Sequence, residues 1–252
     1  MELTPKQQQA RQMVCLPLDG LNSLAELKAR VRELSPVVGL FKIGYESYTR
    51  FGPAAVQAVH EAGAQVFLDL KYHDIPNTVR GAAAAATQLG VYLFNVHAAG
   101  GLAMLEAAVA GAKEAAAKYQ VRAPKIIAVT LLTSLDQAIL NQQLRVPGSV
   151  EEQVLHYAQL ARQAGLAGIV CSATDLGEIR AKLPADFLYV TPGIKGPKIP
   201  AGADQKRVLT PGRALQAGAK ILVVGRAITG PPTAEARIQA GLTILTDLAQ
   251  EL

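Results

Sequence analysis

The feature that most constrains the fold is a series of eight short apolar runs, each followed by a segment with the composition of a helix. The runs are continuous rather than alternating, which is typical of strands that are buried on both faces of a parallel sheet. Eight strand–helix units in a chain of 252 residues favour a closed (β/α)8 barrel over an open doubly wound sheet. The runs cover residues 13–18, 37–43, 65–68, 91–96, 125–130, 168–171, 187–190 and 220–224.

We therefore expect the α/β class and a single domain over residues 1–252, a (β/α)8 TIM barrel with a short extra helix that begins after Thr4. No linker or shift in composition divides the chain, and a hydrophobic content of 50% is enough for a large core. No Gly-x-Gly-x-x-Gly motif follows the first apolar run, which argues against a dinucleotide-binding fold.

Charge and composition exclude several classes of partner. The net charge is +5, but the basic residues are scattered, which indicates a mild preference for anionic ligands rather than a nucleic-acid surface. Aromatic content is 5% without tryptophan, so platforms for stacking single strands are not expected. Cys15 and Cys171 lie in apolar runs, as buried reduced thiols do. Because no stretch approaches the roughly 18 apolar residues of a membrane span, we expect a cytoplasmic protein with no membrane partner.

Three charged side chains lie close together where the third apolar run ends: Asp69, Lys71 and Asp74. Residues two apart in a strand share a face, so Asp69 and Lys71 are expected to point the same way, with Asp74 on the following loop. Such a cluster brings no clear gain to folding, because desolvation offsets much of the attraction within an ion cluster. The alternatives are a structural ion pair at a strand end and a catalytic group.

Other polar residues also follow apolar runs, at the strand ends where barrels of this class build their active sites. These residues are Asp19, Lys42, His97, Thr133, Ser134, Lys195, Gln205 and Arg226. The loops after the seventh and eighth strands frequently bind phosphate, and here they supply glycines and cations: Gly193, Lys195, Lys198, Gly225 and Arg226. The alternative is an exposed loop with incidental lysines. The four histidines have no metal-ligand spacing, so no metal site is expected.

The chain resembles the orotidine 5′-phosphate decarboxylase family over nearly its whole length, in the bacterial form. The resemblance rests first on Asp69-Leu70-Lys71-Tyr72-His73-Asp74-Ile75-Pro76-Asn77-Thr78. Further matching blocks are Leu18-Asp19, Phe41-Lys42-Ile43-Gly44, Asn95-Val96-His97-Ala98, residues 129–134, Thr191-Pro192-Gly193-Ile194, Asp204-Gln205-Lys206-Arg207 and Val224-Gly225-Arg226. The resemblance implies decarboxylation of orotidine 5′-phosphate to UMP in pyrimidine biosynthesis, without a cofactor.

The resemblance also implies a role for each matching residue. Lys71 would donate a proton to C6 of the pyrimidine, and Asp69 would lie beside the leaving carboxylate. Asp74, Ile75 and Thr78 would reach into the active site of a partner subunit, so the working unit would be a homodimer. The remaining substrate contacts would be Asp19 and Lys42 on the ribose, Thr133 on the pyrimidine, and Gln205, Gly225 and Arg226 on the phosphate.

One departure from the family pattern concerns the phosphate site, where Lys195 stands in place of the usual arginine. A lysine supplies charge but not the planar fork of a guanidinium, and Lys198 could substitute for it. Two other functions stay open. One is a Mg-dependent sugar-phosphate decarboxylase or aldolase of the same suprafamily, and the other is a non-catalytic barrel that binds a phosphorylated ligand.

Overall fold

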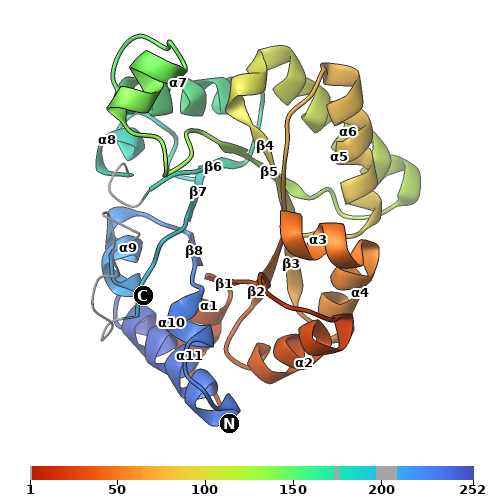
Figure 1. The fold of residues 1–252 in the computed structure, drawn as a ribbon, viewed down its shortest axis with the longest axis vertical. Helices are drawn as coiled ribbons and strands as arrows, with labels where there is room; N and C mark the ends of the chain where they lie inside the picture. Colours follow the sequence, from red (N-terminus) through yellow and green to blue (C-terminus); the bar gives the residue numbers. More distant parts are fainter. Residues whose placement is uncertain (1, 173–175, 197–208) are drawn as a thin grey trace. The chain divides into compact units, whose positions relative to one another are not determined.

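The structure is a computed structural model that describes residues 2–172, 176–196 and 209–252. Its eight strands follow one another in sequence order around a closed barrel (Figure 1). The TIM barrel expected from the eight apolar runs is thus confirmed. The strands are β1 (Val14–Pro17), β2 (Leu40–Gly44), β3 (Gln65–Tyr72), β4 (Leu93–His97), β5 (Lys125–Val129), β6 (Gly168–Val170), β7 (Leu188–Thr191) and β8 (Ile221–Val223).

Helices separate the strands along the chain, and the extra helix expected at the N-terminus is present as α1. Thr4 caps α1 by accepting a hydrogen bond from the Gln7 backbone, and Pro5 occupies the first helical position. The described helices are α1 (Pro5–Arg11), α2 (Leu24–Leu34), α3 (Tyr45–Phe51), α4 (Pro53–Glu61), α5 (Pro76–Gln88), α6 (Gly101–Tyr119), α7 (Val150–Gln163), α8 (Leu176–Arg180), α9 (Pro211–Ala217), α10 (Arg226–Thr229) and α11 (Ala234–Ala249).

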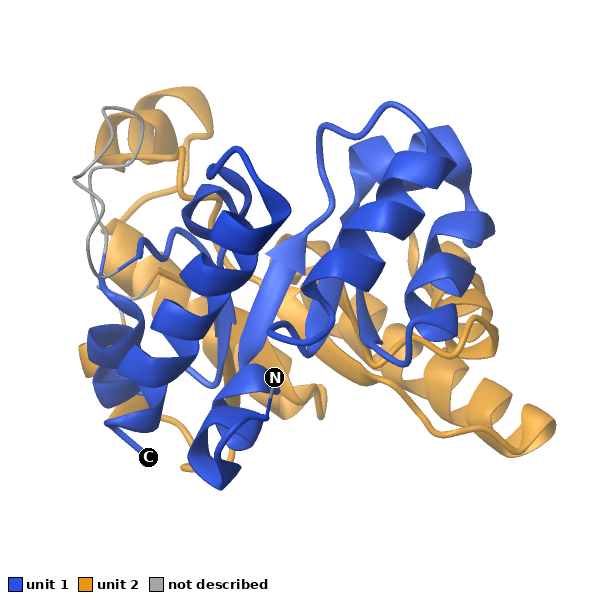
Figure 2. Cartoon of the chain, turned by 90° about the horizontal axis from the view of Figure 1, so that it is seen from below, with its two compact units in different colours: residues 1–69, 190–252 blue, residues 70–189 orange. Residues whose placement is uncertain are grey.

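Two compact units make up the chain (Figure 2). Unit 1 contains residues 1–69 and 190–252, so both ends of the chain belong to it. Unit 2 contains residues 70–189. Each unit is described by itself below.

The core of unit 1 explains why its strands read as continuous apolar runs. Residues on both faces of β2 and β3 are buried, including Phe41 and Phe67. The second strand begins at Leu40, three residues later than the run from Val37 predicted. The backbone N–H groups of Val37 and Val38 both donate to the carbonyl oxygen of Leu34 at 2.9 Å, so these apolar residues finish the turn after α2.

An ion pair joins α2 to α11 within unit 1. The Arg237 guanidinium donates to both carboxylate oxygens of Glu33, at 2.6 and 2.9 Å, and both side chains are less than one-fifth exposed. The hydrogen bonds from Arg237 hold the pKa of Glu33 below its usual range. A bidentate pair of this kind fixes the position of α2 more firmly than a single contact would.

Replacing Glu33 with glutamine is expected to lower the free energy of unfolding at pH 7 by about 1–2 kcal/mol, because one charged acceptor is lost. The folded-state pKa of Glu33 is depressed. The stabilisation of the folded protein by ionised Glu33 is therefore complete above an unfolded-state pKa of about 4.3, and it is lost as the pH falls through the folded-state pKa. Urea unfolding at pH 7 and at lower pH measures the difference. Glu61→Gln is the control, because the pair between Glu61 and Lys28 is exposed. An equal loss in both variants would contradict the prediction.

Unit 2 is built around α5 and α6, which pack closely against each other. Gly111 of α6 lies against the backbone carbonyl of Arg80 in α5, where a β-carbon would not fit. The Arg80 side chain also pairs with Glu114 of α6. The alanine-rich sequence of α5 therefore serves a close contact between helices rather than helix propensity alone.

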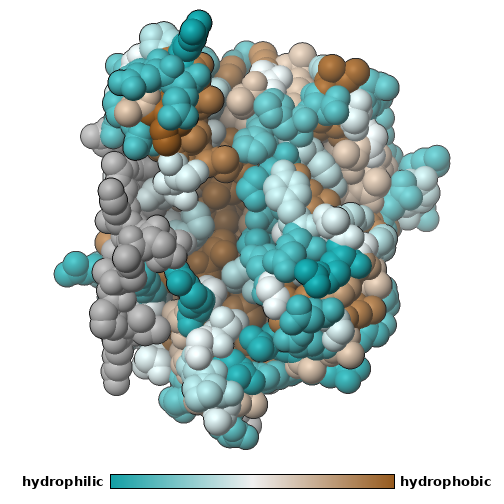
Figure 3. All heavy atoms as spheres, viewed as in Figure 1, coloured by the Kyte–Doolittle hydropathy of each residue, from teal (hydrophilic) through white to brown (hydrophobic). Residues whose placement is uncertain are grey.

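On the face shown in Figure 3, hydrophobic residues are exposed in patches between hydrophilic ones. In the described part of the chain, no helix is both long enough and apolar enough to cross a membrane. The two cysteines, Cys15 and Cys171, are buried and form no disulfide, as their apolar surroundings in the sequence predicted.

Candidate active site

Three charged residues of unit 1 meet at the carboxyl ends of its strands. The Lys42 ammonium lies 3.0 Å from an Asp69 carboxylate oxygen and 3.4 Å from an Asp19 oxygen. The Lys42 and Asp69 side chains are only 13% and 11% exposed, whereas that of Asp19 is 48% exposed. Lys42 is therefore a largely buried cation between a buried carboxylate, that of Asp69, and a half-exposed one, that of Asp19.

The strand register puts these groups together. Gly44 of β2 pairs with Asp69 of β3, and Lys42 lies two residues earlier on β2. A β-carbon on Gly44 would come within 3.0 Å of the Lys42 ammonium and 3.1 Å of an Asp19 oxygen, so glycine leaves room for the ion pairs. Helix α3 follows at once, and the Ser47 hydroxyl donates to the backbone carbonyl of Leu18 beside Asp19.

Burial lowers the pKa of Lys42, but the attraction of Asp69 and Asp19 outweighs it and holds the pKa above the usual lysine value. Burial raises the pKa of the neighbouring Cys15 thiol well above its usual range, with Lys42 acting in the opposite sense. At neutral pH the cluster therefore contains an ammonium and a neutral thiol. An ammonium held between two carboxylates, together with a neutral thiol, suits hydrogen bonding to the hydroxyl groups of a ligand better than nucleophilic attack by sulfur.

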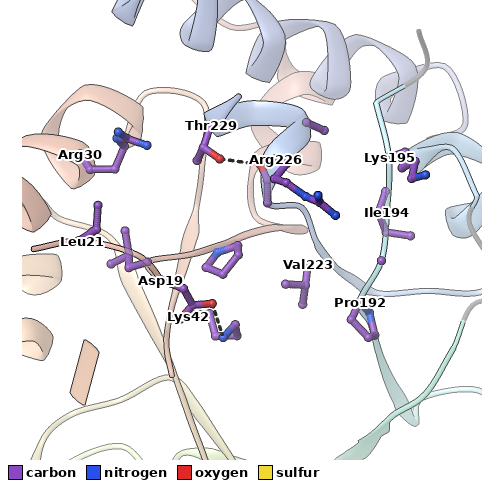
Figure 4. A pocket seen from close by; sticks show the side chains of 15 residues that line it. Asp19, Leu21, Arg30, Lys42, Pro192, Ile194, Lys195, Val223, Arg226 and Thr229 are labelled. Carbon is purple, nitrogen blue, oxygen red and sulfur yellow. Dashed lines mark hydrogen bonds and ion pairs between the residues drawn. The ribbon is translucent and has the colours of Figure 1, made fainter. Parts of the chain in front are cut away.

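A cavity of about 560 Å³ opens beside this cluster, and every described residue that lines it belongs to unit 1 (Figure 4). This volume is in the range of small-molecule sites. Six of the residues predicted from the sequence line it: Asp19, Lys42, Gly193, Lys195, Gly225 and Arg226. In Figure 4 the Arg226 side chain extends toward the segment that carries Ile194 and Lys195. Among the described residues that line the cavity, four have basic side chains and one has an acidic side chain, so this lining favours an anion.

The Lys195 ammonium is buried and has no hydrogen-bond partner among the described residues. A buried cation without a partner is costly, because the desolvation of an ammonium amounts to several kcal/mol. An anion in the adjoining cavity would remove that cost. Lys195 thus has the properties of an anion-binding group, even though it lacks the fork of an arginine.

Lys71 belongs to unit 2 and has an unusual backbone. Its φ angle is +40°, which is uncommon for a residue with a side chain. Its backbone N–H donates to the Asn95 side-chain oxygen at 2.8 Å, and Asn95 at the middle of β4 is buried. Side chains alternate regularly only along extended backbone, so the shared face expected for Asp69 and Lys71 stays a prediction. Strain of this kind is often found at functional positions.

The segment after Lys71 is exposed. Asp74, Ile75 and Thr78 all lie at the surface of unit 2, and Ile75 is 68% exposed. The Asp74 carboxylate accepts a hydrogen bond from the Ile75 backbone at 2.6 Å. Thr133, after β5, is exposed as well. Gln205 and Lys198 lie outside the described residues.

Two histidines of unit 2 lie close to each other, His73 in this segment and His97 at the end of β4. The rings of His73 and His97 lie 5.4 Å apart, centroid to centroid, and are tilted by 42°. Among residues 2–172, 176–196 and 209–252, no group of three or more His, Cys, Asp or Glu side chains could hold a metal ion.

Comparison with known proteins identifies the family. The family described as "Orotidine 5′-phosphate decarboxylase / HUMPS family" matches residues 12–240. The chain belongs to this family. The resemblance carried by residues 69–78 and the other strand-end blocks is thereby confirmed.

Relatives within the orotidine 5′-phosphate decarboxylase / HUMPS family are similar over most of their length. The chain is 49% identical over 234 residues to a protein of Moorella thermoacetica named orotidine 5′-phosphate decarboxylase, covering 92% of this chain and 91% of the relative. A protein of the same name from Syntrophus aciditrophicus is 44% identical over 252 residues, 100% of this chain and 99% of the relative. The crystal structure of orotidine 5′-phosphate decarboxylase from Lactobacillus acidophilus has a TM-score of 0.81 at 33% identity, over 93% and 98% of the two chains.

Sequence reasoning missed several residues of this site. Gly44 and Asn95 lie within the matched family blocks. Their positions in the sequence do not reveal that Gly44 leaves room for the ion pairs of Lys42, or that the Asn95 side chain accepts a hydrogen bond from the Lys71 backbone. Arg30 lines the cavity from α2, away from any strand end. A search restricted to strand ends could not find it, because only the packing of α2 brings it there.

Proposed function

We propose that this protein is a cofactor-free orotidine 5′-phosphate decarboxylase that produces UMP in pyrimidine biosynthesis. The observation that carries the proposal is the basic cavity of unit 1, where residues from four separate parts of the chain converge: Asp19, Lys42, Lys195, Gly225 and Arg226. The names of the relatives favour this activity over the sugar-phosphate branch of the family. A nucleotide with one phosphate matches the excess of basic over acidic side chains in the cavity.

Substrate binding divides between the two ends of the cavity. Lys195, Gly225 and Arg226 bind the phosphate, and Gln205 joins them from the segment before α9. Asp19 and Lys42 bind the ribose hydroxyls. Both residues line the cavity, and their paired carboxylate and ammonium groups can accept and donate hydrogen bonds to hydroxyl groups. Thr133 binds the edge of the pyrimidine.

Loss of CO2 leaves a carbanion at C6 of the pyrimidine with no adjacent carbonyl group to delocalise its charge. Without a cofactor, the protein has to stabilise this charge electrostatically. An ammonium about 4 Å from a unit negative charge contributes roughly 4 kcal/mol at an effective dielectric constant near 20. Lys71 supplies this ammonium and then donates its proton to C6 as a general acid. The bond from its backbone to Asn95 supports the role, because it restrains the residue before the substrate binds.

Two carboxylates complete the catalytic group. Asp69 lies beside the leaving carboxylate of the substrate and also fixes Lys42, to which it is paired at 3.0 Å. Asp74 reaches the active site of a partner subunit, together with Ile75 and Thr78. The exposure of Ile75 supports this arrangement, because a large apolar side chain at the surface is suited to burial by another chain. The working unit is then a homodimer in the cytoplasm.

The decisive test incubates purified, EDTA-treated protein with orotidine 5′-phosphate and follows the ultraviolet absorbance of the pyrimidine. We expect turnover that EDTA does not diminish and that added Mg2+ does not increase. No turnover, or turnover only with Mg2+, would contradict the proposal and favour the sugar-phosphate branch. Binding of UMP without turnover would instead indicate a non-catalytic barrel.

A further inference from the structure

The cavity contains a basic residue that does not come from a strand end. Arg30 lies on α2, half-buried, and lines the same cavity as Lys195, Arg226 and Thr229. In Figure 4 its guanidinium extends toward Thr229, and the three cations lie above Asp19 and Lys42 in this view. The cavity thus has a basic upper part that is distinct from its ion-paired lower part.

The neighbours of Arg30 leave its guanidinium available to a ligand. Glu33, one turn further along α2, attracts Arg30 electrostatically, but both of its oxygens accept hydrogen bonds from Arg237. Lys42, by contrast, is held by Asp69 and Asp19. Asp69 and Asp19 therefore neutralise the part of the cavity that Lys42 lines rather than the part that Arg30 lines.

Helix α2 holds Arg30 in place on the cavity wall. The Ser23 side chain caps the helix, and Leu27, Val31 and Leu34 bury its inner face. The pair between Glu33 and Arg237 ties the helix to α11 within one turn of Arg30. A side chain on a helix fixed in this way loses less freedom when it binds an anion than one on a loop does.

We propose that Arg30 is a further substrate-binding residue, which contacts the phosphate group from α2 opposite Lys195. This inference rests on the proposed function, because it assumes a phosphorylated substrate in the cavity. A phosphate carries a charge between −1.5 and −2 at neutral pH, and each of its three terminal oxygens can accept more than one hydrogen bond, so it can bind a further arginine beside the other phosphate-binding groups. An arginine can take two of these oxygens at once, which a lysine cannot do.

The test compares two single variants of α2 that remove the same charge. Arg30→Gln removes the guanidinium that lines the cavity, and Arg32→Gln removes one that is exposed on the same helix and does not line it. Calorimetry measures the binding of UMP, ribose 5-phosphate and uridine. We expect Arg30→Gln to weaken both phosphorylated ligands about tenfold and to leave uridine unchanged, and Arg32→Gln to change none of them. Arg30→Lys should recover part of the loss.

The outcomes separate this inference from the proposed function. Equal binding of UMP by the wild type and Arg30→Gln would overturn the role of Arg30 while leaving the decarboxylase proposal in place. If the wild type binds ribose 5-phosphate but not UMP, and Arg30→Gln weakens that binding, the role of Arg30 is supported and the proposal of a pyrimidine nucleotide as substrate is contradicted. A wild type that binds neither phosphorylated ligand would overturn both.

Discussion

Substitution of Lys71 by alanine is expected to reduce turnover of orotidine 5′-phosphate by at least about 10³-fold, since the ammonium contributes roughly 4 kcal/mol to stabilising the carbanion. The loss of a general acid adds to this effect. UMP should bind to the variant with nearly unchanged affinity, because the proposed phosphate site is the cavity of unit 1 and does not include Lys71. The measurement is single-turnover decay of the substrate absorbance together with calorimetry of UMP.

A matched control for this variant is Lys113→Ala, which removes an exposed lysine from α6 of the same unit. It should retain wild-type turnover. A Lys71→Ala protein that remains folded, binds UMP and keeps more than about a tenth of the wild-type rate would show that the general acid is another group.

Mixing two inactive variants is expected to restore activity if each site is built from two subunits. In a dimer of one Lys71→Ala and one Asp74→Ala chain, one site has both substitutions and the other has neither. Random exchange places half of the chains in such mixed dimers, so about a quarter of all sites should be intact. Starting from two proteins with almost no turnover, the mixture should therefore reach roughly a quarter of the wild-type rate.

Subunit exchange has to be shown separately, for example by native mass spectrometry of one tagged and one untagged variant. A mixture that exchanges and stays inactive would contradict a shared site. Mixing Lys71→Ala with Asp69→Ala provides the negative control, because the proposal assigns both residues to the same subunit's site. This second mixture should gain no activity, because each site of its mixed dimers lacks either Lys71 or Asp69.

The barrel could be predicted from the sequence because burial on both faces leaves a direct trace in the residues. Phe41 and Phe67, for example, lie on neighbouring strands whose residues are buried on both sides. The strand-end polar residues of unit 1 could be predicted for a related reason. Once the barrel is fixed, Asp19 and Arg226 follow the carboxyl ends of their strands and Lys42 lies within β2 two residues before its end, and all three line one cavity.

The parts that the sequence did not predict depend on local geometry or on packing. Helix α3 has 7 residues and α10 has 4, and they begin directly after Gly44 and Gly225. Helices this short, with no loop between them and the strand, show no helical periodicity of apolar residues in the sequence. The positive φ angle of Lys71 cannot be foreseen, since lysine itself disfavours it and only the hydrogen bond to Asn95 reveals how it is held. Arg30 depends on how α2 packs.

The ion pairs around Lys42 have a consequence for how the protein responds to acidity. Because the pKa of Lys42 is raised by Asp69 and Asp19, its stabilising contribution is complete below an unfolded pKa of about 10.4 and disappears only as the pH rises through the higher folded value. The charge of this lysine is therefore constant throughout the physiological range. Between pH 5 and 8 the protonation state that changes most in a loaded cavity is that of the ligand, whose phosphate loses its second proton near a pKa of about 6. The pH dependence of nucleotide binding should therefore reflect the ionisation of the phosphate, because the charge of Lys42 does not change in this range.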